Sequence, residues 1–282
     1  MVENRPWLTV MAHVILILGI AVVAFPIYTT FIASTHTLET VMRPPLPLLP
    51  GQHFLENYTN ALFHGASRLG NIPIWRMLIN SAGMALIIAI GKIIISIISA
   101  YAIVYFRFPF RMLCFWMIFI TLMLPVEVRI VPTFKVVSEL GLLDSFAGLT
   151  VPLIASATAT FLFRQFFLTV PEELLEAARM DGAGPFRFFK DILLPLSRTN
   201  IAALFVILFI YGWNQYLWPL LVTTKPEMMT TIVGLKSMIS FADADTQWHL
   251  VMATTILAML PPILVVVIMQ RLFVKGLIET EK

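Results

Sequence analysis

The chain has 282 residues, of which 59% are hydrophobic and only 12% are charged, about half the charged fraction of a typical soluble domain. The net charge of +3 is small, and no basic stripe with interleaved aromatic residues indicates nucleic-acid binding. A single cysteine, Cys114, excludes a disulfide-stapled fold. The charges form short patches between long continuous apolar runs, which is typical of a helical membrane protein rather than of a β-barrel.

The apolar runs predict an all-α membrane protein with six transmembrane helices in one transmembrane domain, residues 1–282. We expect these spans at about 8–33, 79–106, 112–134, 146–167, 201–224 and 250–273. The third is the least regular, because Pro125 and Pro132 can break a helix and Glu127 and Arg129 lie between them.

Lys and Arg are more frequent in the segments that face inward if the N-terminus is cytoplasmic. This bias predicts a multi-pass protein of the bacterial inner membrane with both termini in the cytoplasm. The longest external segment, 34–78, then contains the proline-rich stretch "RPPLPLLPG", Arg43 to Gly51, which predicts a stiff connector.

One inward segment, about residues 169–196, is densely charged, and we call it the charged loop. Thr169 and Glu172 have the spacing of a capping box before a helix in "EELLEAARMD". Gly182 is suited to end that helix, because glycine accepts the left-handed conformation. Pro185 then suits the first turn of a second short helix.

Two interpretations of the charged loop follow from its residues alone. It is an amphipathic segment lying at the membrane surface, or it is a docking element for a soluble partner. In the second case Ala177 and Ala178 allow close approach, and Glu176 can pair with a basic residue of that partner.

The spacing within "EAARMDGAGPFRFFKDILLP" resembles the coupling-loop motif of ABC importer permeases. The matching positions are Glu176, Ala177, Ala178, Gly182, Ile192, Leu194 and Pro195. The resemblance implies that the loop, including Arg179 and Asp181, inserts into a cleft of the ATPase subunit and couples ATP-driven closure to the membrane helices.

The resemblance covers nearly the whole chain. "YGWNQYLWPLL", Tyr211 to Leu221, is similar to the fifth span of the carbohydrate-uptake branch. "NRPWL", "FRFP" and "ASATATFLFRQFF" resemble the permeases of that branch that import sn-glycerol-3-phosphate. The resemblance therefore implies a type I ABC importer permease fold and that substrate, with glycerophosphodiesters, a neutral sugar or another polyol phosphate left open.

The same resemblance implies a set of partners. These are a homologous permease forming a heterodimer, two ATP-binding subunits, a periplasmic substrate-binding protein and membrane lipid, with no nucleic acid. ATP hydrolysis would lie on the separate subunit, so the chain itself is expected to be no enzyme and to need neither cofactor nor metal.

Four polar residues stand out in the expected spans. Lys92 lies roughly 20 Å from either end of the second span at 1.5 Å per residue, and Arg129 lies at the outer end of the third. Asn214 and Gln215 interrupt the fifth. Each is a candidate for the translocation path, and each has a structural alternative: a buried pair for Lys92, a rim salt bridge for Arg129 and interhelical bonding for the amides.

Rival functions are less well matched. "IGKII", Ile90 to Ile94, lacks the Ser or Thr of a phosphate-binding loop. An ion-coupled secondary transporter typically shows inverted repeats and several intramembrane charges, whereas this sequence has one central charge. That interpretation also gives the charged loop no role.

Overall fold

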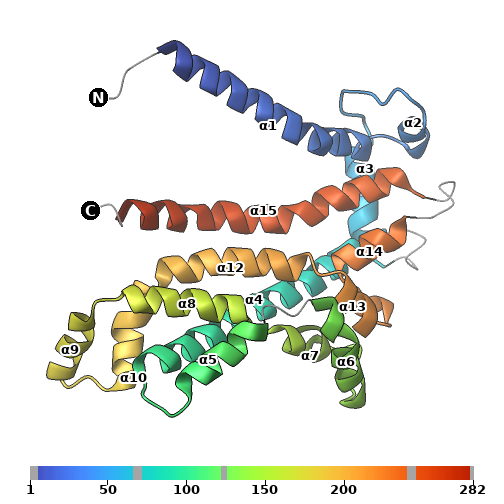
Figure 1. Ribbon diagram of the computed structural model, residues 1–282. Helices are drawn as coiled ribbons and strands as arrows, with labels where there is room; N and C mark the ends of the chain where they lie inside the picture. The colour runs from blue at the N-terminus through green and yellow to red at the C-terminus, as the bar shows by residue number, and fades with distance from the viewer. Residues whose placement is uncertain (1–5, 66–71, 122–125, 240–245, 280–282) are drawn as a thin grey trace. The chain divides into compact units, whose positions relative to one another are not determined.

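The computed structural model describes residues 6–65, 72–121, 126–239 and 246–279, and within these ranges the regular structure is helical (Figure 1). Contacts group the chain into two compact units. The first comprises residues 1–76 and 234–260, and the second residues 77–233 and 261–282.

Among the described residues, three helices are each long and apolar enough to cross a membrane. They are α1 (Pro6–Ser34), α4 (Ile74–Tyr105) and α15 (Trp248–Glu279). Their positions agree with the helices expected at 8–33, 79–106 and 250–273. Proline lies inside two of them, Pro26 in α1 and the pair Pro261 and Pro262 in α15, and neither helix ends there.

The first unit folds the segment that follows α1 back on the end of that helix. It contains α2 (Leu38–Met42), α3 (Phe54–Thr59) and a π-helical turn, Asn60–His64. The Asn57 side-chain amide donates to the backbone oxygens of Ser34 and His36 at 2.9 and 2.8 Å. The Gly51 amide donates to the Thr35 hydroxyl at 2.7 Å. These bonds hold Gly51, the last residue of the proline-rich connector, and Asn57 after it against the residues at the end of α1.

In the second unit, the third expected span is divided between two helices. These are α5 (Arg111–Ile120) and α6 (Val126–Glu139). Pro125 lies outside the described residues. Pro132 lies inside α6 without ending it, so of the two prolines that we expected to break the helix, this one does not.

The fourth expected span, 146–167, is broken rather than continuous. It consists of α7 (Phe146–Thr150), a 3₁₀ turn (Val151–Leu153) and α8 (Ala157–Thr169), and the two parts are bent by 47°. Pro152 cannot donate to the preceding turn, and Ser156 then begins a new helix by accepting the Ala159 amide at 3.2 Å.

The fifth expected span, 201–224, is also interrupted. α12 (Arg198–Trp213) ends at Asn214, and α13 (Leu217–Val222) begins three residues later. The remaining helices are α14 (Thr231–Met238), a 3₁₀ turn (Pro226–Met228), and in the charged loop α9 (Glu172–Met180), α10 (Pro185–Phe188), a π-helical turn (Phe189–Leu193) and α11 (Leu194–Leu196).

The core of the second unit joins α4, α8 and α12, which lie side by side in Figure 1. Small residues of α4 allow close approach: a Cβ atom built on Gly212 of α12 would lie 2.9 Å from the Ala85 Cα atom. Such small-residue contacts are the usual means of packing helices in a membrane, where the hydrophobic effect does not drive association. Phe163, Phe209 and Trp213 fill the space around this contact.

Polar contacts fix the loop after α13. The Asp144 carboxylate accepts the Thr224 and Lys225 amides at 2.6 and 2.8 Å and the Thr224 hydroxyl at 2.6 Å. The pKa of the Asp144 carboxyl is lowered, chiefly by the Thr224 hydroxyl and next by the Lys225 amide. Farther along, the Asn80 side chain donates to the backbone oxygens of Glu227 and Met229.

Replacing Asp144 by Ala is expected to speed hydrogen exchange at the Thr224 and Lys225 amides in the detergent-purified protein. Because the folded-state pKa lies below the ordinary value of about 3.9, the stabilisation is present above that value and is lost as pH falls through the folded-state pKa. The difference between variant and wild type should shrink in that acidic range. Asp191→Ala, which removes only an exposed ion pair with Arg187, is the control; equal exchange in wild type and Asp144→Ala at pH 7 would contradict the assignment.

Candidate functional site

The first helix of the charged loop, α9, begins at Glu172. The expected capping box at Thr169 is wrong: Thr169 is the last residue of α8, and its hydroxyl donates back to the Phe166 oxygen at 2.7 Å. Pro171 is the N-cap and offers no side-chain bond. Glu172 and Glu173 instead favour the helix start through their negative charge near the helix dipole.

The end of α9 agrees with the sequence prediction. Gly182 has a φ of +71°, in the left-handed region that glycine accepts without a Cβ clash. The Gly182 amide donates to the Arg179 oxygen at 3.0 Å, and the Ala183 amide donates to the Ala178 oxygen at 2.9 Å. These two bonds form a Schellman motif, which fixes the direction of the chain before α10 begins at Pro185.

The two alanines of the motif have opposite environments. Ala178 is buried, 4% exposed, in one cluster with Phe188 and Leu193. Ala177, one position earlier, is exposed. The charged loop therefore uses one face of α9 to pack on its own second half and leaves the other face open.

Large apolar side chains also lie on the open side of the charged loop. Met180 is 83% exposed and Phe186 is 76% exposed. Both lie beside charged residues in a segment outside the long apolar helices. Apolar side chains exposed in such a setting are typical of a surface that contacts a partner.

Two tyrosines at the end of α4 hold the charged loop. The Tyr101 hydroxyl donates to the Pro185 oxygen at 2.8 Å, and its ring centroid lies 5.0 Å from that of Phe189. The Tyr105 ring lies 5.3 Å from the Phe188 ring. Tyr105 also reaches α8, where its hydroxyl donates to the Phe167 oxygen at 3.4 Å. The loop is thus attached to a long helix through aromatic packing by both tyrosines and through the hydrogen bond from Tyr101.

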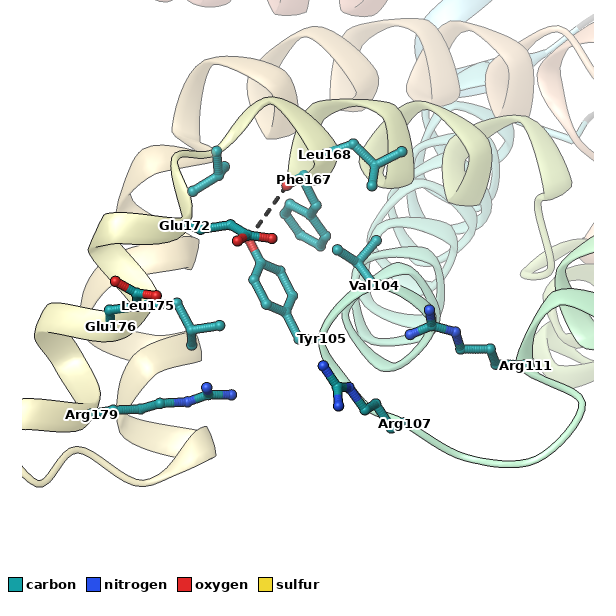
Figure 2. A pocket seen from close by; sticks show the side chains of 11 residues that line it. Val104, Tyr105, Arg107, Arg111, Phe167, Leu168, Glu172, Leu175, Glu176 and Arg179 are labelled. Carbon is teal, nitrogen blue, oxygen red and sulfur yellow. Dashed lines mark hydrogen bonds between the residues drawn. The ribbon is translucent and has the colours of Figure 1, made fainter.

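A cavity of about 440 Å³ lies between this anchor and α9 (Figure 2). Arg107 and Arg111, which follow α4, line it together with Arg179 of α9. Glu172 and Glu176 also line it. Within the described part of the chain no ion pair joins these arginines to these carboxylates. Both signs of charge at the cavity therefore remain available to groups from outside the chain.

The residues predicted for ATPase coupling all lie in the charged loop, and most of them are exposed. Glu176, Ala177, Arg179, Asp181 and Gly182 are exposed at and just after α9. In the second half of the loop Leu194 is exposed, while Ile192 and Pro195 are half-buried. Ala178 is the exception, since its side chain points into the loop's own core.

The residues predicted for the translocation path fall into two groups. Lys92 is buried, 6% exposed, and its Nζ atom lies 3.8 Å from the centroid of the Tyr211 ring. Arg129, on α6, is exposed, and its neighbour Ile130 packs against the same apolar cluster as Tyr211. These two cations thus belong to one neighbourhood, although they come from different helices.

The two amides lie at the break after α12. Gln215 joins the first group, because its Nε2 atom donates to the Tyr211 oxygen at 3.1 Å. That bond satisfies a backbone carbonyl which the interrupted helix leaves without its usual amide partner. Asn214 is the C-cap of α12 and its side chain is exposed. The structure therefore gives Gln215 a definite bonding role and leaves Asn214 facing outward.

Three tyrosines with clear contacts received no role from the sequence. Tyr211 lies at the start of the quoted "YGWNQYLWPLL" motif, but nothing in a single sequence indicates that it faces Lys92. Tyr101 and Tyr105 have a signal that was available: they are four residues apart at the end of an apolar helix, on the same face and next to the charged loop.

A crystal structure of a bacterial ABC transporter involved in the import of the acidic polysaccharide alginate has a chain with the same fold. The TM-score is 0.79 at 21% sequence identity, over 96% of this chain and 98% of that one.

Relatives of known name match from end to end. The sn-glycerol-3-phosphate transport system permease proteins UgpE of Agrobacterium fabrum and Escherichia coli O157:H7 are 67% and 59% identical to this chain, over 100% of both chains. Residues 92–279 match the family described as binding-protein-dependent transport system inner membrane component. With this match and these relatives, the chain belongs to the family of binding-protein-dependent inner membrane transport components.

Proposed function

We propose that the chain is the permease subunit that carries sn-glycerol-3-phosphate across the inner membrane in an ATP-driven importer. The observation that carries this proposal is the 59–67% identity, over the full length, to permeases named for that substrate. Glycerophosphodiesters are further candidates, because they share the glycerol phosphate group.

Family membership already makes the chain a multi-pass transport subunit rather than an enzyme. A permease of an ABC importer works with ATP-binding and substrate-binding components. We propose the finer composition that the sequence resemblance implies: a heterodimer with a homologous permease, two ATP-binding subunits and one periplasmic binding protein.

The charged loop is proposed as the contact with the ATP-binding subunit. On the open face of α9 the small side chain of Ala177 lies between the charged side chains of Glu176 and Arg179. The fixed turn at Gly182 presents that face, and exposed Met180 adds an apolar contact. Movement of this loop would pass to α4 through the Tyr101 and Tyr105 anchor.

This assignment requires the charged loop to lie in the cytoplasm, and with it both termini. In a Cys114→Ser background, Met180→Cys should react with a membrane-impermeant maleimide in inverted vesicles and not in intact spheroplasts. Leu49→Cys, in the opposite expected segment and also strongly exposed at 75%, should show the reverse pattern. Labelling of both positions from one side would contradict this topology.

The substrate is tested by uptake into cells that lack only this chain, with and without a plasmid copy. Rescue should restore uptake of labelled sn-glycerol-3-phosphate and not of maltose. Rescue should disappear when ATP is depleted while the proton gradient is kept. ATP-dependent rescue of maltose uptake alone would keep the transporter class and discard the substrate, and rescue that survives ATP depletion would indicate an ion-coupled transporter.

The coupling role predicts a difference between two glutamates of α9. Glu176→Arg reverses a charge on the proposed docking face and beside the cavity, so uptake and co-purification of the ATP-binding subunit should both fall by more than about tenfold. Glu173→Arg makes the same change on the same short helix but away from the cavity lining. Equal behaviour of the two variants, with both proteins inserted at normal levels, would contradict the assigned face.

A further inference from the structure

Lys92 is a buried cation with an incomplete set of partners. Its Nζ atom lies over the Tyr211 ring, and a ring face attracts a cation through its quadrupole. In the described part of the chain no carboxylate forms an ion pair with Lys92. A charge in the middle of an apolar helix is costly, and in membrane proteins it commonly marks the path of an ion or substrate.

Arg129 adds a second positive charge to the same place. Ile130, the next residue of α6, packs against the same apolar cluster as Tyr211, and that cluster contains Ile88, one helical turn before Lys92 on α4. Arg129 too has no ion pair among the residues that the structure describes. Two like charges close together repel each other, and the repulsion is strong where little water screens it. An anion that both can reach would remove this repulsion.

Tyr211 and Gln215 fix the surroundings of Lys92, so its position is not a chance approach of two side chains. The Tyr211 ring positions the Lys92 ammonium, and Gln215 holds the Tyr211 backbone at the break after α12. An ammonium held against a ring keeps N–H donors for another acceptor, because the ring face uses no directed lone pair. Arg129 brings a planar fork of donors suited to phosphate oxygens.

We propose that Lys92 and Arg129, beside Tyr211, bind the phosphate group of the substrate during its passage through the membrane. This rests on the proposed function, because a phosphate monoester is the part of sn-glycerol-3-phosphate that carries charge, between about −1.5 and −2 at pH 7. Two cations match that charge. The glycerol hydroxyls have no part in this site.

The contrast with the cavity at the charged loop supports this choice of location. That cavity also has arginines, but Glu172 and Glu176 line it as well, so its own carboxylates compete with any anion. Around Lys92 no described carboxylate forms an ion pair with either cation. A phosphate group has the negative charge and the acceptor oxygens that complement Lys92 and Arg129.

The test uses the complete complex in proteoliposomes with its binding protein, and measures sn-glycerol-3-phosphate transport and ATP hydrolysis in parallel. Lys92→Gln and Arg129→Gln should each lower transport by about tenfold or more and leave ATP hydrolysis stimulated by the loaded binding protein within about twofold. Lys92→Arg should retain most transport, because it keeps the charge. Lys135→Gln, which removes an exposed cation from the same helix as Arg129, should match wild type.

The dependence of transport on the charge of the substrate phosphate separates substrate binding by Lys92 from a structural role. The second pKa of a phosphate monoester is about 6, so the substrate is mostly a monoanion at pH 5.5 and mostly a dianion at pH 7.5. Relative to wild type at the same pH, Lys92→Gln should lose more transport at pH 7.5 than at pH 5.5. A structural defect would lower both by the same factor, and that result would overturn the proposal.

The outcomes distinguish this proposal from the proposed function. If wild type transports sn-glycerol-3-phosphate and both neutral variants match it within about twofold, only the phosphate site is overturned. If wild type transports a neutral sugar and no phosphate ester, both are overturned. Should Lys92→Gln fail to assemble, Arg129→Gln decides the question, because Arg129 is exposed and its replacement leaves no buried gap.

Discussion

The packing of the charged loop against the end of α4 is the contact on which a mechanical role depends. Tyr101 contacts the loop through its ring and through a hydrogen bond to the Pro185 oxygen, and Tyr105 contacts it through its ring while its hydroxyl bonds to α8, so the loop is held in direction as well as in distance. The same helix carries Lys92 farther along. One continuous helix therefore joins the surface that is suited to a soluble partner to the charge that is suited to a substrate, and a rigid helix transmits displacement without needing a chain of small adjustments.

A second constraint acts throughout the membrane part: each backbone polar group needs a partner within the protein. The breaks in the fourth and fifth spans are tolerated because side chains supply those partners. Gln215 donates to the Tyr211 carbonyl, and the Trp218 indole donates to the Gly148 carbonyl at 3.1 Å. At the two helix breaks the backbone carbonyls therefore keep hydrogen-bond partners. A break bonded in this way can bend without exposing unpaired carbonyl groups to lipid.

Sequence reasoning succeeded where the signal is local. Gly182 and Pro185 were expected to end one short helix and start the next, and both do so, because their backbone preferences are intrinsic. Thr169 failed because a capping pattern does not reveal that the residue already belongs to the preceding helix. The bend at Pro152 was hidden inside an apolar run, and the pairing of Lys92 with Tyr211 depends on which faces of two distant helices meet. Which residues are buried, and which faces of two helices meet, depend on tertiary packing. No short pattern in a single sequence shows this packing.

The opposite environments of Ala177 and Ala178 restrict how this loop can change in length over evolution. Successive residues of an α-helix point about 100° apart, so inserting or deleting one residue in α9 would turn its outer face inward. Arg179 or Ala177 would then take the place of Ala178 against Phe188 and Leu193. Point substitutions on the open face are compatible with the fold, whereas length changes between Pro171 and Gly182 are not. Relatives that exchange one ATP-binding partner for another should therefore differ here in side chains and not in spacing.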